Sequence, residues 1–170
     1  MKHLRSIISL LMVTLIVSLS FTGCGKEKPT VIPYTDLTLD NTYEDMIKAE
    51  GESNETSDSF YEGTAYSYPK TYLGLDGDVT YNYDADNQLC SISWMYVADS
   101  KEDVSDIYNN IKKELVSSYG KSGYSTGVST NSGDVWYRKE GNIILSCVTT
   151  DSLSALSYSY MHPSVSSKHK

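Results

Sequence analysis

Residues 77–97 read Gly-Asp-Val-Thr-Tyr-Asn-Tyr-Asp-Ala-Asp-Asn-Gln-Leu-Cys-Ser-Ile-Ser-Trp-Met-Tyr-Val, and this stretch decides the fold class. Apolar and polar side chains alternate in its first part, Val79 to Tyr83, and again from residue 89 to residue 97. Alternation with a period of two is typical of a β-strand that is buried on one face. The residues between the two runs, Asp84 to Asn87, have the composition of a turn. The stretch therefore predicts a β-hairpin over residues 79–97.

Two amphipathic helices are predicted, one on each side of this hairpin in the sequence. In residues 39–51, Asn41 or Thr42 can cap a short helix that ends at Gly51. After the hairpin, Ser100 to Asp103 resembles a capping box. The apolar residues that follow have helical spacing and end before Gly120, which is typical of a position just after a helix; they are Val104, Ile107, Tyr108, Ile111, Leu115 and Tyr119.

Further strands are predicted on both sides of the second helix. One or two short edge strands are expected in residues 60–75, and three strands in residues 135–139, 142–149 and 153–161, with Glu140-Gly141 as a tight turn. We expect loops in the acidic, serine-rich residues 51–59 and in the glycine- and serine-rich connection after Gly120. The prediction is an α+β fold with an antiparallel sheet of about five to seven strands and two helices on one face.

A short string recurs in the sequence. Gly77-Asp78-Val79-Thr80-Tyr81 returns as Gly133-Asp134-Val135-Trp136-Tyr137, at an offset of 56 residues. Each copy follows a predicted helix that ends in glycine. This predicts an internal duplication in which a helix and a hairpin occur twice, and the alternative is a chance similarity of short strings.

The N-terminal residues have the pattern of an export signal. Lys2 and Arg5 precede an apolar run over residues 7–21, which is shorter than the roughly twenty residues that span a bilayer core. Thr22 and Gly23 then lead into Cys24. This arrangement resembles the lipobox of bacterial lipoproteins, with Phe21 where that family usually has an aliphatic residue. An uncleaved anchor and an ordinary secretory signal are the alternatives.

The lipobox resemblance implies that Cys24 carries a diacylglycerol with fatty acyl chains such as palmitate, and that cleavage occurs just before it. We therefore expect a signal peptide over residues 1–23, a lipidated cysteine with a flexible tether over residues 24–38, one domain over residues 39–163, and a disordered tail over residues 164–170. The expected location is the cell membrane, with the domain on the extracytoplasmic side.

Charge excludes one class of partner. The chain has 14 basic and 22 acidic residues. Loss of residues 1–23 removes Lys2 and Arg5, which leaves 12 basic against 22 acidic residues and a net charge of −10. An acidic domain is unsuited to nucleic acid, whose phosphates attract basic proteins. The acidic balance also argues against a polybasic grip on anionic lipid headgroups.

The order of elements also resembles the small envelope domains of the BamE-like and beta-lactamase-inhibitor-like group. The resemblance covers residues 39–161 and depends on the element order and on an opening with Leu39, Thr42-Tyr43-Glu44-Asp45-Met46-Ile47 and Gly51. It implies an α+β fold and leaves the function open; known members of the group include assembly factors and inhibitors rather than catalysts. No functional motif of the group is carried over.

The sequence contains few residues suited to catalysis. Of its three histidines, only His162 lies near the end of a predicted strand, and no histidine or cysteine cluster has zinc-ligand spacing. Asp84-Ala85-Asp86-Asn87 resembles part of a calcium loop but lacks its glycine and later glutamate. Cys90 and Cys147 could form a disulfide, although the repeat places them on opposite strand faces, which favours free thiols. We expect no enzyme, cofactor, metal or disulfide.

The fifteen tyrosines are the remaining candidates for a binding function. If the helices cover one face of the sheet, the other face could expose aromatic rings, with Tyr81, Tyr83, Trp136 and Tyr137 as the selected candidates. Packing of these rings against each other is the alternative. The expected function is a membrane-anchored binding domain for a protein or peptide of the cell envelope. A binder of cell-wall glycan is the second hypothesis, and an envelope hydrolase is the third.

Overall fold

The computed structural model describes residues 28–53, 55–128 and 131–165, which contain two helices and eight strands. The helices are α2 (Tyr43–Glu50) and α3 (Ser105–Tyr119). The strands are β1 (Glu55–Asp58), β2 (Glu62–Tyr72), β3 (Leu75–Asp84), β4 (Leu89–Ala98), β5 (Tyr124–Val128), β6 (Asn131–Trp136), β7 (Asn142–Thr149) and β8 (Ser154–Met161).

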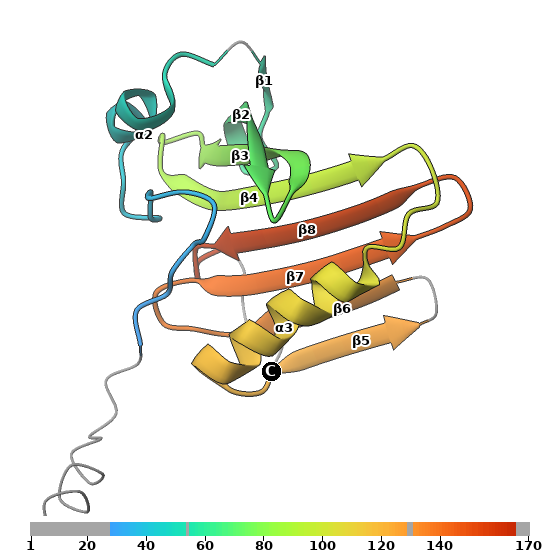
Figure 1. The fold of residues 1–170 in the computed structure, drawn as a ribbon. Coiled ribbons are helices and arrows are strands. Elements are labelled where there is room, and N and C mark those ends of the chain that lie inside the picture. The colour runs from blue at the N-terminus through green and yellow to red at the C-terminus, as the bar shows by residue number, and fades with distance from the viewer. Residues whose placement is uncertain (1–27, 54, 129–130, 166–170) are drawn as a thin grey trace, which may run out of the picture.

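All eight strands form one antiparallel sheet in the order β1-β2-β3-β4-β8-β7-β6-β5 (Figure 1). The central pair is β4 with β8, in register from Ser91 opposite Met161 to Ala98 opposite Ser154. Each helix is followed in the chain by four strands, and the two groups of four strands meet at this central pair. The predicted α+β class with an antiparallel sheet is confirmed.

The sheet has more strands than the five to seven predicted. The additional strands are β1 and β5, which form in the two stretches expected to be loops. Both lie at the edges of the sheet, where each pairs on one side only. All four residues of β1 are exposed, so no apolar face has to be buried and no alternation appears in its sequence.

Corresponding residues of the two copies of the repeated string differ in their burial. Asp78 is exposed, whereas Asp134 is fully buried, and Tyr81 is buried, whereas Tyr137 is half-buried. The string falls in β3, which pairs with the central strand β4, and in β6, which is separated from β8 by β7. The repeat in the sequence therefore does not match the arrangement of two helix-plus-four-strand units.

Helix α2 begins as predicted, whereas α3 does not. Thr42 and Asp45 form a reciprocal capping box, and Met46 is fully buried. Helix α3 begins at Ser105 after Val104, which makes no side-chain capping bond, so the capping box predicted at Ser100–Asp103 is wrong. The reason is a competing contact: the Ser154 hydroxyl binds both the N–H and the C=O of Glu102.

Residues 28–42 form a strap across the sheet, coloured blue in Figure 1. Four of its side chains are buried in the core: Ile32, Tyr34, Leu37 and Leu39. The Tyr34 hydroxyl donates to the Tyr158 carbonyl at 2.8 Å, and the Ile92 carbonyl lies 3.2 Å away. The flexible tether predicted over residues 24–38 is therefore wrong for residues 28–38, which belong to the domain.

Several predictions lie outside the described residues. These are the signal peptide over residues 1–23, the lipidated Cys24 and most of the tail, residues 166–170. Within the described part of the chain, neither helix has the length and apolar character needed to cross a bilayer.

Candidate functional site

Three of the four aromatic residues selected from the sequence lie in the core. Tyr81, Tyr83 and Trp136 are at most 2 % exposed, and Tyr137 is half-buried. Large apolar rings lose contact with water when they pack together, and eight close ring pairs surround this core. The hypothesis of an exposed aromatic face at these positions is therefore contradicted for Tyr81, Tyr83 and Trp136.

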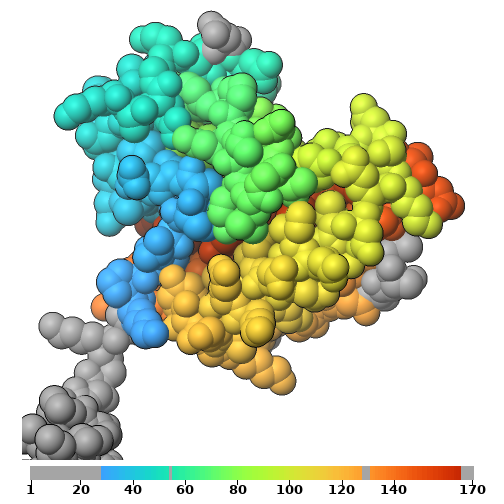
Figure 2. All heavy atoms as spheres, in the orientation of Figure 1, coloured from blue at the N-terminus to red at the C-terminus, as the bar shows by residue number. Residues whose placement is uncertain are grey.

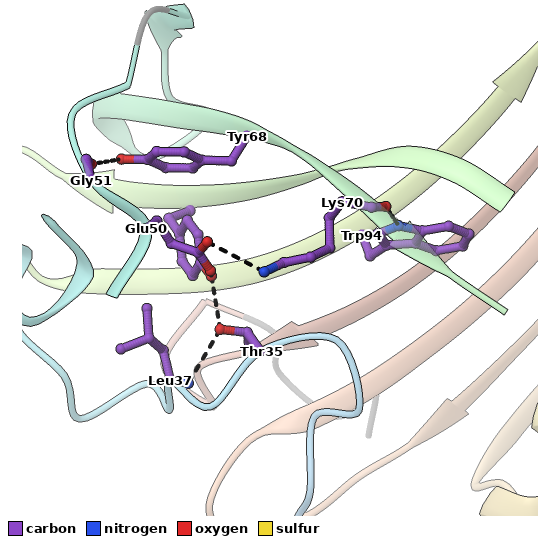
Figure 3. Close-up of polar contacts among 8 residues, drawn as sticks. Thr35, Leu37, Glu50, Gly51, Tyr68, Lys70 and Trp94 are labelled. Atoms are coloured by element: carbon purple, nitrogen blue, oxygen red, sulfur yellow. Dashed lines mark hydrogen bonds and ion pairs between the residues drawn. The ribbon is translucent and has the colours of Figure 1, made fainter. Parts of the chain in front are cut away.

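A polar network around Glu50, Lys70 and Thr35 connects the strap, α2 and the sheet (Figure 3). Tyr81 belongs to this network. Its hydroxyl donates to Glu50 Oε1 at 2.6 Å and lies 2.8 Å from Thr35 Oγ1. The second Glu50 oxygen, Oε2, pairs with Lys70 Nζ at 3.3 Å. The backbone on both sides is also bound, since Tyr68 donates to the Gly51 carbonyl and Trp94 donates to the Lys70 carbonyl.

The charges within this network are already satisfied. Burial, followed by the hydrogen bond to Glu50, raises the pKa of Tyr81 well above its ordinary value, so its hydroxyl remains a proton donor. Both Glu50 oxygens have partners, and a groove of about 490 Å³ beside them is lined by Asp36, Lys70 and strap residues. The network therefore fastens the strap to the sheet.

The other chemical candidates also have local structural roles. The Cys90 and Cys147 thiols are free and buried, and burial raises the pKa of each, which favours the unreactive protonated form. Asp84 Oδ1 accepts the N–H groups of Asp86 and Gln88 and thereby closes the hairpin turn. Residues 28–53, 55–128 and 131–165 contain no cluster of three potential metal ligands.

The side chains on the opposite face of the central strands differ from the core in size and polarity. Strand pairing places twelve residues of β4, β8 and β7 on this side, which we call the uncharged face: Ser91, Ser93, Met95, Val97, Ala155, Ser157, Ser159, Met161, Asn142, Ile144, Ser146 and Val148. None of them is charged, in a chain with a net charge of −8. Met95 and Val97 are 50 % and 48 % exposed.

A groove of about 360 Å³ lies at the β2 side of the uncharged face. Hydroxyl side chains from five strands line it: Ser57, Ser67, Thr80, Ser91, Ser93, Ser157 and Ser159. Asp58 of β1 adds one carboxylate at its rim. Phe60, in the turn between β1 and β2, stands at this groove and is 96 % exposed. Burial raises the pKa of the neighbouring Tyr61, and a hydrogen bond with Ser91 opposes this rise. The groove therefore combines hydroxyl groups, the Asp58 carboxylate and one fully accessible ring.

The serines of the central strands mark this face in the sequence. Residues 157–160 read Ser-Tyr-Ser-Tyr, and residues 91–94 read Ser-Ile-Ser-Trp. Alternation shows that the serines and the rings point to opposite sides, and the larger apolar volume of the rings places them in the core. The small hydroxyl residues, rather than the aromatic residues, therefore mark the second face.

Comparison with known proteins does not assign this chain to a family. No protein-family model matches the chain, and no curated protein matches it. One solved structure is similar, a DUF4309 family protein, YjgB, from Bacillus subtilis subsp. subtilis str. 168. It has 14 % sequence identity and a TM-score of 0.47, over 80 % of this chain and 87 % of that chain.

Proposed function

We propose that the protein is a membrane-anchored extracytoplasmic lipoprotein whose domain binds a protein or peptide of the cell envelope and has no catalytic role. The anchor is supported by the sequence around Cys24, with its basic start, short apolar run and small residues before the cysteine. Two acyl chains on one sulfur hold a protein firmly, whereas one chain gives only marginal binding.

The observation that carries the binding role is the uncharged face. Both helices and the strap contact residues on the face of the sheet that carries Tyr81. Tyr43 of α2 packs on Tyr83, Tyr108 of α3 donates to Asp134, and Tyr34 of the strap packs on Tyr158. We infer that these elements share one face of the sheet and that no described helix covers the other.

An uncharged surface of this extent fits a protein partner. The buried centres of protein interfaces are depleted of charged residues and enriched in aromatic residues and methionine. Met95, Met161 and Phe60 provide such side chains, and methionine adapts its shape to a partner. The serine hydroxyls among them can donate and accept hydrogen bonds with peptide groups.

The test introduces a charge on this surface at Met95 of β4, whose neighbour across the border of the face is Asp78 of β3. Met95→Asp should abolish capture of the partner from the organism's own membranes, because a carboxylate buried without a partner costs binding energy. Val116→Asp is the matched control, since Val116 is 42 % exposed on α3 and lies away from the uncharged face. The partner must then bind the purified wild-type protein and Val116→Asp, and fail to bind Met95→Asp. Equal binding by all three would refute this surface.

Glycan is the second candidate, favoured by Phe60 beside the hydroxyl-lined groove. An exposed ring can stack on a sugar face while serine hydroxyls bond to the sugar's own hydroxyls. Phe60→Ala should then remove binding to purified cell-wall glycan in a sedimentation assay. Retained binding would exclude this form of the hypothesis.

A further inference from the structure

The strap leaves the domain at one defined corner, between the C-terminal end of α3 and the β6–β7 turn. There Arg138 donates from Nη2 to the Lys28 carbonyl and from Nε to Thr30 Oγ1, at 3.0 Å for the second bond. The Arg138 guanidinium carbon lies 4.2 Å from the centroid of the Tyr119 ring. The N–H of Thr30 bonds to Glu140 Oε2 at 3.3 Å. The chain is therefore fastened to the domain from Lys28 onward.

Figure 2 shows this arrangement from the strap side. The strap, in blue, runs between the green β2–β3 region and the yellow and orange α3, and it reaches the edge of the domain beside the end of α3. We call the surface formed there by Lys28, Tyr119, Lys121, Arg138 and Lys139 the exit corner. The three lysines are exposed, and Arg138 and Tyr119 are half-buried.

Only three residues separate Cys24 from Lys28. An extended chain covers at most about 3.6 Å per residue, so the Lys28 backbone in the exit corner lies within ~15 Å of the Cys24 backbone. We propose that the exit corner rests on the surface of an anionic lipid bilayer and that this contact sets the orientation of the whole domain. The inference rests on the proposed acylation of Cys24.

Charge supports this orientation. The exit corner has Lys28, Lys121, Arg138 and Lys139, with Glu140 and Asp40 as acidic neighbours, although the chain as a whole is acidic. The opposite end of β4, β7 and β8 is acidic and has Lys101 as its basic residue; its acids are Asp99, Glu102, Asp103 and Asp151. A negative lipid surface attracts the first set and repels the second.

The basic exit corner and the acidic opposite end of the sheet are far enough apart to interact differently with a bilayer. Strand β7 has eight residues, which corresponds to ~26 Å at the usual rise per residue. That exceeds the Debye length of about 8 Å at physiological ionic strength, so each end interacts with the bilayer separately. The acidic Asp84–Asp86 turn lies at the exit-corner end but across β8 and β4, so repulsion tilts that half of the sheet away from the lipid.

The test measures the distance of two exposed serines from the lipid. Ser118→Cys places a fluorophore beside the exit corner, and Ser152→Cys places the same fluorophore in the β7–β8 turn at the opposite end. The full lipidated chain is reconstituted in phosphatidylglycerol-containing vesicles that carry nitroxide-labelled headgroups. The labelled wild type measures any background from Cys90 and Cys147. Quenching is expected to be several-fold stronger at residue 118 than at residue 152.

Two further variants separate the possible causes. A long Gly-Ser linker inserted after Glu27 should remove the difference in quenching while flotation with the vesicles continues. Lys121→Glu combined with Lys139→Glu should reduce the difference, whereas the matched change Lys101→Glu should leave it intact. Flotation with equal quenching at both positions would overturn the orientation and leave the anchor in place. Failure to float would overturn the acylation and this inference together.

Discussion

At the scale of single residues, the buried charge of Asp134 connects side chains from several elements. Its side chain is fully buried and receives hydrogen bonds from Tyr108 and, at 2.8 Å, from Ser122. Lys112 Nζ lies 2.7 Å from its Oδ2. Burial raises the pKa of Asp134, but Lys112 and the hydroxyl donors lower it more, so the net pKa lies below the ordinary value. One carboxylate thus connects α3 to β6.

Replacing this carboxylate should be costly. We expect Asp134→Asn to lower the free energy of unfolding by about 1–3 kcal/mol at neutral pH, because hydrogen bonds to a charged group are lost. The control is Asp78→Asn, the exposed counterpart in the repeated string, which should change it by less than about 0.5 kcal/mol. Urea denaturation measures both, and equal values would contradict the assigned role.

The pH dependence of this effect has a definite sign. Because the pKa of Asp134 is lowered in the fold, its stabilisation is present above the unfolded value of about 4. It is lost as the pH falls through the lower folded value. The difference between the wild type and Asp134→Asn should therefore shrink in acid, and a difference that grew in acid would reverse the proposed sign.

At the scale of elements, the strap behaves as part of the core. It has no helix or strand of its own, yet it buries four apolar side chains and bonds to β4, β8 and the β6–β7 turn. Its sequence does contain a pattern typical of a buried segment. Ile32 and Tyr34 are apolar residues spaced two apart, and so are Leu37 and Leu39. The two prolines, Pro29 and Pro33, interrupt this pattern and make it resemble a linker.

The strap can be tested by truncating its central ring. Tyr34→Ala should lower the free energy of unfolding by about 3–5 kcal/mol, as expected when a buried aromatic side chain leaves a cavity. Val31→Ala is the matched control in the same segment, because Val31 is 65 % exposed and should contribute less than about 0.5 kcal/mol. A small effect of Tyr34→Ala would mean that the strap detaches in solution.

At the scale of the whole molecule, the domain has two unlike faces. One face holds the aromatic core, and the other holds small hydroxyl residues with Met95, Val97 and Met161. If the exit corner rests on lipid as proposed, the strands rise from the membrane, and the uncharged face remains accessible to a partner from the side.

The anchor itself has a direct test. Cys24→Ala should release the mature protein from membranes or leave the precursor uncleaved, because the sulfur that receives the lipid is absent. Fractionation and intact mass show the outcome. Cys147→Ala is the control, since its thiol is buried in the sheet and has no expected role in anchoring. Membrane retention of a processed Cys24→Ala form would refute the lipoprotein proposal.

The sequence alone determined the α+β class, the hairpin over residues 79–97, a cap of α2 at Asn41 or Thr42 and the glycine ends of both helices. These features depend on local periodicity and on contacts between residues close in the sequence, so the sequence is enough to predict them. Only the tertiary structure decided the two edge strands, the docking of the strap and the burial of Tyr81, Tyr83 and Trp136. The physical reason is that these depend on distant partners. An edge strand forms only when a neighbouring strand pairs with it. Alternation in the sequence divides the residues of a strand between two faces, but it does not show which face the rest of the chain covers.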